Sequence, residues 1–482
     1  MDNKIKISEY YELNKTQYEL DFVDTYINGD KTLFVDPYAL SKRKDDWSIL
    51  ANNEVVNFFQ LILRSIKDNP SLAKEMLGNL SEPNETHLGL SEKESKGKGV
   101  SGKQSNDLYM NLSESKAVQT GFVKDLSDCE LMVAGIGYDK ISDITINIIR
   151  KYLIEYTQEQ CNIHSIPMLD VASGKIWNSE QKMWTNDYTY LPVINDKKLL
   201  LVPKRIVVYK PFLSSNEYYN RDILEYLQAE HIRAMSSLVH LLKDGTRKVH
   251  KKVLKEQDEY KYSKDFIYSF SNEHPELLGQ YKNRKETADN YNLDVYYSDD
   301  EDLEKVIAQE LIEKLKVIKA GKDDAYNFHN YCMGALEFIF YPNLTIPKKE
   351  DKINNGRKSI DITYQNSADK GFFFNIHTAQ QTKSNIVMVE CKNYSHDPEN
   401  PELDQLAGRF SPMRGKFGIL LARNFTNTNL FIERCRDTAK EDKGVIIPLA
   451  DSHIEEMLNL IKNGNRDLID DYMYEVYRKI IT

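Results

Sequence analysis

The sequence predicts a mixed α/β protein built from more than one domain. A chain of 482 residues exceeds the size at which single hydrophobic cores stop growing, so we expect several domains. Apolar residues make up 41% of the chain and charged residues 29%, which is the balance of a globular protein with real cores. Helix-like and strand-like apolar patterns alternate most regularly in the last third, which predicts a mixed sheet flanked by helices there.

The sequence of residues 1–215 predicts an α/β domain. Whether this domain serves in recognition or in regulation is left open by the sequence. Strand-like runs such as Thr32–Asp36 and Lys198–Pro203 occur beside helix-like runs such as Glu54–Lys67 and Ile144–Gln158. Between them, residues 84–105 are rich in Gly, Ser, Lys and Glu and almost devoid of large apolar residues. That composition predicts a long exposed loop.

Residues 216–321 predict a helical connector or arm. Apolar residues recur at spacings of three and four between Arg221 and Lys243, and Asp302–Lys319 repeats this pattern, as amphipathic helices require. A basic segment, Lys243–Lys255, lies between the two. The helical surfaces of this region offer a place for a homo-oligomer, a dimer or larger, to form.

Residues 322–482 show the clearest order of elements. We expect a helix, then three short strands in a meander, then helix, strand, helix, strand and two closing helices. Their predicted bounds are Tyr326–Phe340, Ser359–Tyr364, Phe372–His377, Ile386–Glu390, Pro401–Phe410, Phe417–Ala422, Leu430–Lys440, Gly444–Leu449, Asp451–Ile461 and Asp467–Ile481.

Two carboxylates and a lysine stand on neighbouring predicted strands of this last region. Asp361 belongs to the first strand, and the apolar run Ile386–Val389 ends abruptly in Glu390, Cys391 and Lys392. Charged groups at the end of a core strand need a partner, and a divalent cation is a suitable one. Glu390 and Lys392, two apart on a strand, could instead form a surface ion pair of little energetic value.

The order of these elements resembles the PD-(D/E)xK nucleases, also called the restriction-endonuclease-like superfamily, over the last third of the chain. In the branch similar to Mrr-type restriction enzymes, Asp361 would match the first half-motif, and Glu390 with Lys392 the second half-motif. Glu337 would match the glutamate of the preceding helix and Gln405 the glutamine of the following one. The chain departs from the pattern in one place, because Ile360 stands where the motif has proline.

The resemblance implies a metal-dependent phosphodiesterase. Asp361 and Glu390 are hard oxygen donors suited to Mg²⁺ or Mn²⁺, the Cys391 carbonyl could add a ligand, and Glu337 could support a second ion. Lys392 would orient the attacking water or stabilise developing charge. Gln405 would position Lys392, the water or a phosphate.

Basic residues around the candidate site could contact phosphates. Arg357 and Lys358 precede Asp361, while Arg409, Arg414 and Lys416 follow Gln405 in a stretch without acidic residues. The alternative is a solvated basic edge of the domain. The net charge of −10 argues against a protein that coats nucleic acid indiscriminately, since such binding depends on neutralising phosphates.

Cysteine usage and hydropathy favour a cytoplasmic protein. The five cysteines are odd in number and never occur in Cys-x-x-Cys spacing, so neither a disulfide framework nor a zinc site is predicted. The chain has no apolar signal core at its start and no long uncharged apolar stretch, so we expect no membrane segment.

The resemblance therefore predicts a DNA endonuclease that acts in defence against foreign DNA. Two alternatives stay open. The chain could be a catalytically silent nucleic-acid-binding or scaffold protein that keeps the nuclease fold. It could also be a nucleotide-responsive sensor in which the N-terminal domain controls the nuclease.

Overall fold

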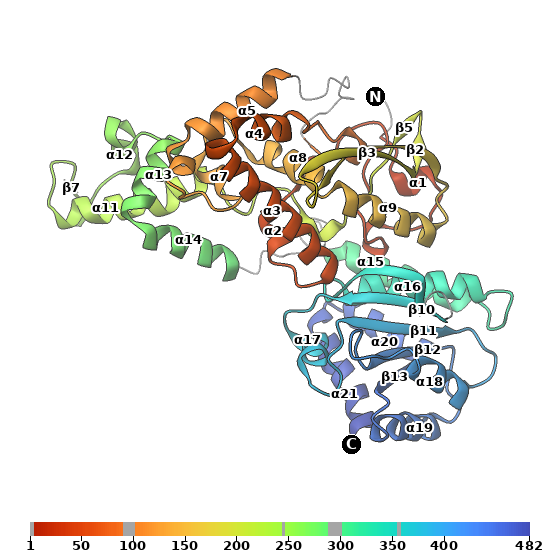
Figure 1. The fold of residues 1–482 in the computed structure, drawn as a ribbon. Helices are drawn as coiled ribbons and strands as arrows, with labels where there is room; N and C mark the ends of the chain where they lie inside the picture. The colour runs from red at the N-terminus through yellow and green to blue at the C-terminus, as the bar shows by residue number, and fades with distance from the viewer. Residues whose placement is uncertain (1–3, 90–101, 243–245, 288–300, 354–357) are drawn as a thin grey trace.

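The computed structural model describes residues 4–89, 102–242, 246–287, 301–353 and 358–482 (Figure 1). The predicted α/β class is confirmed, because a five-stranded mixed sheet forms the C-terminal part of the molecule and helices flank it. The remaining sheets of the described residues have two strands each. Among these residues, no helix combines the length and apolar character needed to cross a lipid bilayer.

The N-terminal part is mostly helical. Its strands are limited to short pairs and one longer hairpin, β2–β3, so it contains less sheet than the sequence predicts. The helices are α1 (Ile7–Tyr10), α2 (Pro37–Ser41), α3 (Asp46–Asp68), α4 (Pro70–Gly78), α5 (Gly102–Glu114), α6 (Lys116–Gln119), α7 (Asp128–Met132), α8 (Tyr138–Ile148) and α9 (Arg150–His164). The strands are β1 (Phe34–Val35), β2 (Leu169–Asn178), β3 (Met183–Leu191), β4 (Val193–Ile194), β5 (Lys197–Lys198) and β6 (Val207–Val208).

Helix α3 shows how the sequence builds this part. The side chain of Asp45 caps the helix by accepting a hydrogen bond from the Ser48 backbone nitrogen at 2.8 Å. Val55, Phe58 and Ile62 recur at helical spacing and are buried in the N-terminal core. The predicted loop 84–105 falls largely outside the described residues, although residues 102–114 form α5.

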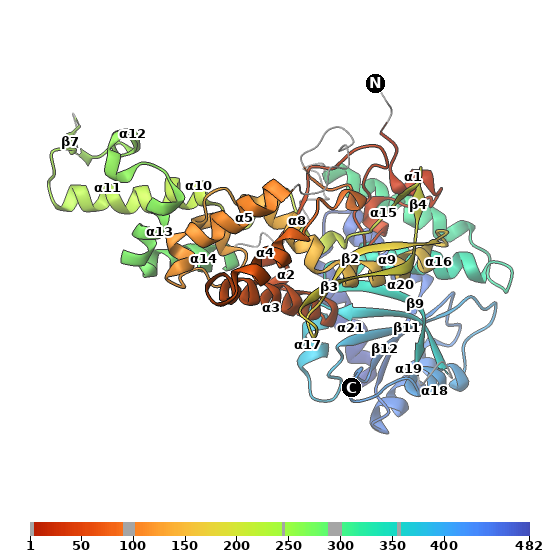
Figure 2. The same ribbon diagram turned by 45° about the horizontal axis from the view of Figure 1, so that its top comes forward.

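The apolar faces of the predicted connector 216–321 are buried against two different cores. The helices after residue 215 share the N-terminal core, whereas α15 shares the C-terminal one. The elements are α10 (Ser215–Glu217), a π-helical stretch (Tyr218–Ile223), α11 (Leu224–Arg233), β7 (His240–Leu241), β8 (Arg247–Lys248), α12 (Lys251–Glu256), α13 (Lys264–Glu273), α14 (Pro275–Thr287) and α15 (Glu301–Val317). In Figure 2, α11, α12 and β7 lie at the end of an arm that projects from the body.

The C-terminal sheet has the strand order β13-β12-β11-β10-β9. Strands β9, β10 and β11 pair antiparallel, and β11, β12 and β13 pair parallel. The elements are α16 (Ala325–Phe340), β9 (Leu344–Ile353), β10 (Lys358–Asn366), α17 (Gly371–Thr378), β11 (Ile386–Lys392), α18 (Asn400–Ala407), β12 (Phe417–Ala422), α19 (Thr428–Lys440), β13 (Val445–Ala450), α20 (Asp451–Lys462) and α21 (Ile469–Ile481).

Two elements of this sheet differ from prediction. Residues 372–377, expected as a strand, lie in helix α17, where Phe372, Phe373 and Ile376 are buried on one side. In the predicted meander this run would lie between β10 and β11, but these two strands pair directly with each other, and β9 pairs with the other edge of β10. The other predicted helices and strands of this region occur within a few residues of their expected bounds.

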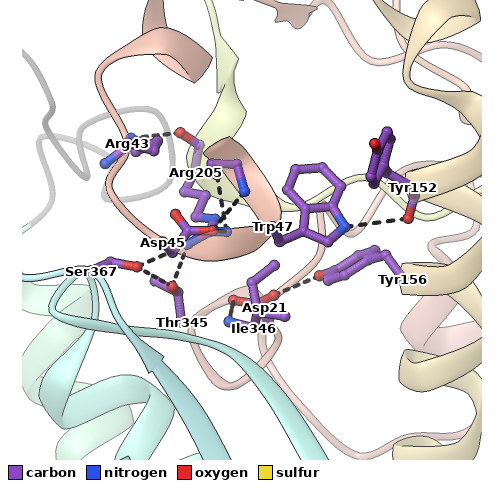
Figure 3. Close-up of polar contacts among 11 residues, drawn as sticks. Asp21, Arg43, Asp45, Trp47, Tyr152, Tyr156, Arg205, Thr345, Ile346 and Ser367 are labelled. Atoms are coloured by element: carbon purple, nitrogen blue, oxygen red, sulfur yellow. Dashed lines mark hydrogen bonds and ion pairs between the residues drawn. The ribbon is translucent and has the colours of Figure 1, made fainter. Parts of the chain in front are cut away.

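A 3-10 turn of the N-terminal part, Lys204–Ile206, contacts the C-terminal sheet through its side chains. Arg205 is buried and donates hydrogen bonds to Asp45 and Ser48 on its own side and to Thr345 and Ser367 on the sheet side (Figure 3). Nearby, the Asp21 carboxylate accepts hydrogen bonds from the Tyr156 hydroxyl and from the Ile346 backbone nitrogen of β9 (Figure 3). The two parts of the chain therefore share a buried polar interface.

Candidate active site

The structure places Asp361 and Glu390 opposite each other on adjacent strands. Ile362 of β10 pairs with Val389 of β11, so the next antiparallel pair brings Asp361 across from Glu390. Residues directly opposite in such a pair project from the same face of the sheet and have closely spaced Cβ atoms. The Asp361 carboxylate also accepts a hydrogen bond from the Cys391 backbone nitrogen at 2.9 Å, which fixes its orientation.

Glu390 is fully buried, and only one of its two carboxylate oxygens accepts hydrogen bonds from residues that the structure describes. Its Oε1 accepts hydrogen bonds from Lys392 Nζ at 2.8 Å and from Gln405 Nε2 at 2.6 Å. Its Oε2 is buried and has no hydrogen-bond partner among the described residues. Burial raises the pKa of Glu390, as does the charge of Asp361, while Lys392 acts against both. A carboxylate oxygen left in this state is costly unless a further group binds it.

Lys392 lies on the same face as Glu390, two residues further along β11. Burial alone would lower the pKa of Lys392, but the neighbouring Glu390 and Asp361 carboxylates outweigh burial and raise the pKa above its ordinary value. The ammonium group is therefore charged at neutral pH. With a side-chain exposure of 11%, it is held close to both acids rather than projecting into solvent.

Gln405 reaches Glu390 because α18 packs closely on this face. Gly418 of β12 pairs with Met388, which shares a face with Glu390. A Cβ atom at position 418 would lie 3.1 Å from a methyl carbon of Leu406 in α18 and 3.1 Å from the Met388 carbonyl oxygen. Glycine at this position thus lets the helix approach the sheet and delivers the Gln405 amide to the carboxylate.

The residues on this face fit a magnesium ion. Asp361 and the unpartnered Oε2 of Glu390 supply carboxylate oxygens, and Mg²⁺ is commonly bound by one or two carboxylates together with several waters. In the part of the chain that the structure describes, no group of three or more His, Cys, Asp and Glu side chains is arranged to hold a metal ion. Asp361 and Glu390 would therefore be the two side chains that bind the ion.

The Cys391 thiol lies on the opposite face of β11. It contacts the Cys332 thiol of α16, and this contact, together with burial, raises the pKa of Cys391 well above its ordinary range. The thiol is therefore protonated and faces the apolar layer beneath the sheet. The role predicted for this residue concerns its carbonyl oxygen, and that role stays a prediction.

Glu337 does not join the carboxylates. Its Oε1 lies 3.0 Å from Lys204 Nζ of the interdomain turn, and both side chains are buried. Burial raises the pKa of Glu337 to about 7, against the favourable charge of Lys204. The expected catalytic and metal-supporting roles of Glu337 are therefore corrected, because its carboxylate is part of the interface with the N-terminal part.

The packing of α16 explains this difference. The helix contacts Cys391 through Cys332, so it covers the face of the sheet opposite to Glu390. The Tyr364 hydroxyl donates to the Met333 carbonyl at 3.1 Å, which aligns the middle of α16 with the later half of β10. The end of the helix that carries Glu337 thus extends away from Asp361.

His329 is the α16 residue that lies beside the backbone of Asp361, on the face that α16 covers, and sequence reasoning missed it. Burial lowers the pKa of His329, while the Asp361 carboxylate acts in the opposite direction. Its Nε2 atom is buried and lacks a hydrogen-bond partner among the described residues. Because it precedes Glu337 by eight residues, it lies about 12 Å away along the helix axis.

Among the described residues predicted to contact phosphates, Arg409 lies near enough to the acids for its charge to act on Glu390. Its Nε donates to the Ser359 carbonyl at 2.9 Å. Arg414 supports this position by donating from Nη2 to the Arg409 carbonyl at 2.7 Å. Arg357 lies outside the described residues, as does the side chain of Lys358.

Lys416 lies at the other end of the sheet. It pairs with Asp442 at 3.0 Å just before β12 begins, whereas Lys392 pairs with Ala422 at the end of that strand. Six strand residues separate the two levels, a span of about 20 Å. The expected role of Lys416 as a phosphate contact beside the carboxylates is therefore corrected.

Comparison with known proteins identifies a likeness in the N-terminal part. Residues 12–214 match a family model described as "Domain of unknown function (DUF8370)". A search of curated proteins found no match to the chain. The matched segment contains the Lys204–Ile206 turn but none of the residues around Asp361 and Glu390.

Proposed function

We propose that the chain is a magnesium-dependent nuclease that hydrolyses phosphodiester bonds, with DNA as its substrate. The observation that supports this most is the convergence of Asp361, Glu390, Lys392 and Gln405 on one face of the sheet, with one buried Glu390 oxygen left without a partner. A surface ion pair would be exposed to solvent and would contribute little to stability, whereas the side chains of Lys392 and Glu390 are largely buried.

Each residue has a separate task in this proposal. Asp361 and Glu390 would hold the ion, which would polarise a phosphoryl oxygen and lower the pKa of a bound water. Lys392 would stabilise negative charge that develops on the phosphoryl group, since its ammonium stays charged beside the acids. Gln405 would hold Glu390 in place through the hydrogen bond to Oε1.

The choice of DNA and of a defence role rests on the resemblance to PD-(D/E)xK enzymes. The proposed enzyme is an endonuclease that cuts foreign DNA, and the N-terminal part would recognise a trigger or restrain cutting. The buried interface around Arg205 supports such control, because a change at this turn would reach Thr345 of β9 and Ser367, which directly follows β10.

The decisive experiment compares matched pairs of variants on plasmid and single-stranded DNA, with Mg²⁺ or with EDTA. Asp361→Asn and Lys392→Met alter the candidate site. Asp442→Asn and Lys416→Met make the same chemical changes in an exposed ion pair at the other end of the sheet. We expect the first two to lower the cleavage rate by about 10²-fold or more and the second two to leave it unchanged.

The outcomes separate the alternatives. Cleavage by the wild type that EDTA stops, and that only the site variants lose, supports the nuclease. DNA binding without cleavage at any metal concentration would favour the silent scaffold protein. Equal cleavage by wild type and Lys392→Met would show that any nuclease activity belongs to another site or to a contaminant.

A further inference from the structure

The end of the helical arm carries a concentration of positive charge that the candidate active site does not use. We define the arm tip as the described residues of 231–255, which comprise the last three residues of α11, strands β7 and β8, and most of α12. This segment contains no acidic residue among its described positions. Its basic residues are Arg233, Arg247, Lys248, Lys251, Lys252 and Lys255.

The basic side chains are presented on a fixed scaffold. Val249 and Leu254 are fully buried and anchor the hairpin and α12 to the arm. The Gln228 side chain donates to the Val249 carbonyl, which ties α11 to the end of β8. Within the hairpin, Leu241 pairs with Arg247 and His240 with Lys248. The charges therefore do not depend on a loose loop for their position.

Most of these charges have no protein partner. Lys251 pairs with Glu225 at 2.8 Å, and Lys255 lies 6.0 Å from the centre of the Tyr219 ring. Arg233, Arg247, Lys248 and Lys252 are exposed and form no ion pair with any residue that the structure describes. In a chain of net charge −10, such a cluster indicates a binding partner of opposite charge.

We infer that the arm tip binds the phosphate backbone of duplex DNA. Duplex DNA presents about one negative charge per 1.7 Å of its axis, which suits several cations held close together. A two-stranded β-ribbon fits the major groove, and the hairpin has the exposed apolar side chain of Leu241, 72% accessible, beside its cations. These features combine charge with a contact surface for sugars and base methyl groups.

An anionic membrane is the less suitable partner. Interfacial membrane binding uses a long amphipathic helix with a continuous apolar face. Helix α12 has only 6 residues, and Leu254 on its apolar side is buried in the arm rather than available to lipid. The exposed apolar residues at the tip, such as Met235 in the turn after α11 and Leu241 in β7, do not share the face of one helix.

The inference rests on the proposed function, because it names duplex DNA as the substrate that the arm captures for the C-terminal site. Figure 2 shows the arm projecting from the side of the body, away from the C-terminal sheet. A duplex long enough to extend from the arm tip to the C-terminal sheet would be tethered to the same chain, which raises its effective concentration at the candidate site. Binding and cutting would then be separable properties.

The test measures binding of the full-length chain to a fluorescent 30-base-pair duplex by anisotropy, in EDTA so that no cleavage occurs. The test variant neutralises three exposed tip cations: Arg247→Gln, Lys248→Gln and Lys252→Gln. The control variant neutralises three exposed lysines elsewhere, Lys116→Gln, Lys440→Gln and Lys479→Gln, and changes the net charge equally. Salt titration from 50 to 300 mM and circular dichroism complete the comparison.

Three lost phosphate contacts should weaken binding by up to about 2.7 log units at 0.1 M salt, one tenfold step below 1 M. Within this limit we expect the tip variant to bind roughly 100-fold more weakly. Its salt dependence should fall by about 2.7 log units per tenfold change in salt for the same reason. The control should bind like the wild type. Equal loss in both variants, or no loss in either, would overturn the inference.

Two further outcomes separate this inference from the nuclease proposal. Wild-type binding that depends on the tip, in a chain that never cleaves DNA, would refute the nuclease and keep the arm as a DNA-binding surface. If the tip variant cleaved DNA with full metal-dependent activity, the inference that the arm tip captures the substrate would be refuted. Tip-dependent binding to anionic vesicles, with none to duplex, would also refute it and identify a membrane surface.

Discussion

Replacing Arg205 with methionine should destabilise the protein strongly, because this residue balances a buried charge at the interface of the two parts. The Arg205 guanidinium pairs with Asp45, and both side chains are fully buried. Methionine retains much of the volume of arginine but removes every donor. Asp45 would then be a carboxylate without a cation in the interior of the protein.

The magnitude follows from what each former partner keeps. Removing one member of a buried ion pair costs about 3–5 kcal/mol. Thr345 and Ser367 still hydrogen-bond each other at 2.6 Å, so neither is left without a partner. Asp45 retains the hydrogen bond from the Ser48 nitrogen at 2.8 Å. The lower end of the range, about 3 kcal/mol, is therefore expected.

A double variant isolates the electrostatic cause. Adding Asp45→Asn to Arg205→Met removes the uncompensated charge but keeps a good helix N-cap for α3, since asparagine caps as well as aspartate. We expect this double variant to lie within about 1 kcal/mol of the wild type, since replacing a whole buried pair is often nearly neutral.

Urea unfolding followed by tryptophan emission is the appropriate assay. The chain has three tryptophans, Trp47, Trp177 and Trp184, all within the N-terminal part, and the Arg205 guanidinium lies 6.0 Å from the Trp47 ring. Far-ultraviolet circular dichroism monitors the whole chain in parallel. A loss under about 1 kcal/mol for Arg205→Met, or a double variant as unstable as the single one, would refute the reasoning.

Three further predictions concern the candidate site and its surroundings. Glu337→Gln should retain cleavage; it should also flatten the pH dependence of stability. Because the pKa of Glu337 rises from 4.5 to about 7 on folding, the folded chain binds this proton more tightly, so wild-type stability should fall by up to about 3 kcal/mol as pH rises across that window. Cys391→Ala should leave metal-dependent cleavage within a few-fold of wild type, because the thiol faces away from Glu390. Gly418→Ala should push α18 outward, break the Gln405 contact with Glu390 and lower the cleavage rate about tenfold or more.

Each of these predictions has a contrary result. Loss of cleavage by a folded Glu337→Gln chain would place that residue in the catalytic machinery. If this variant and the wild type showed the same pH dependence of unfolding, the pKa of Glu337 would not be raised in the folded chain. A Cys391→Ala variant that no longer responds to Mg²⁺ would give the thiol a metal-binding role. A Gly418→Ala variant with wild-type activity would show that the close approach of α18 does not govern the site.

The central strands of the C-terminal sheet could be predicted because they are uninterrupted apolar runs. Both Phe417–Ala422 and Val445–Ala450 are buried at every position. A strand that is covered on both faces needs apolar residues throughout, and such a run is easy to recognise in a sequence. The edge strand β9 was missed because it contains Pro347 and a charged run, which conceal a strand in the sequence, and because its buried first half packs against the N-terminal part.

The run Phe372–His377 shows the limit of short apolar patterns. Six residues of this kind are compatible with a buried strand or a short helix, and only tertiary packing decides between them. Here α17 packs against α21, so helical spacing of Phe372, Phe373 and Ile376 is the arrangement that buries them.

The grouping of Asp361, Glu390 and Lys392 could be predicted from local rules. The position of Glu337 could not be predicted in this way. Lys392 shares a face with Glu390 because it lies two residues further along the strand, and antiparallel neighbours meet directly. Helix α16 is buried continuously from Tyr331 to Phe340, so its sequence has no polar side from which an orientation could be read. Arg205, as a buried cation within an apolar segment, carried no local signal at all.

The position of the Lys204–Ile206 turn has a practical consequence for dissecting this protein. The segment that matches the family model ends at residue 214, so a fragment cut there would keep Lys204 but lose the Glu337 carboxylate that neutralises it. Such a fragment would also expose the apolar seat of Ile346, which packs among N-terminal residues. Limited proteolysis of the intact chain is therefore a better guide to separable pieces than the boundary of the sequence match.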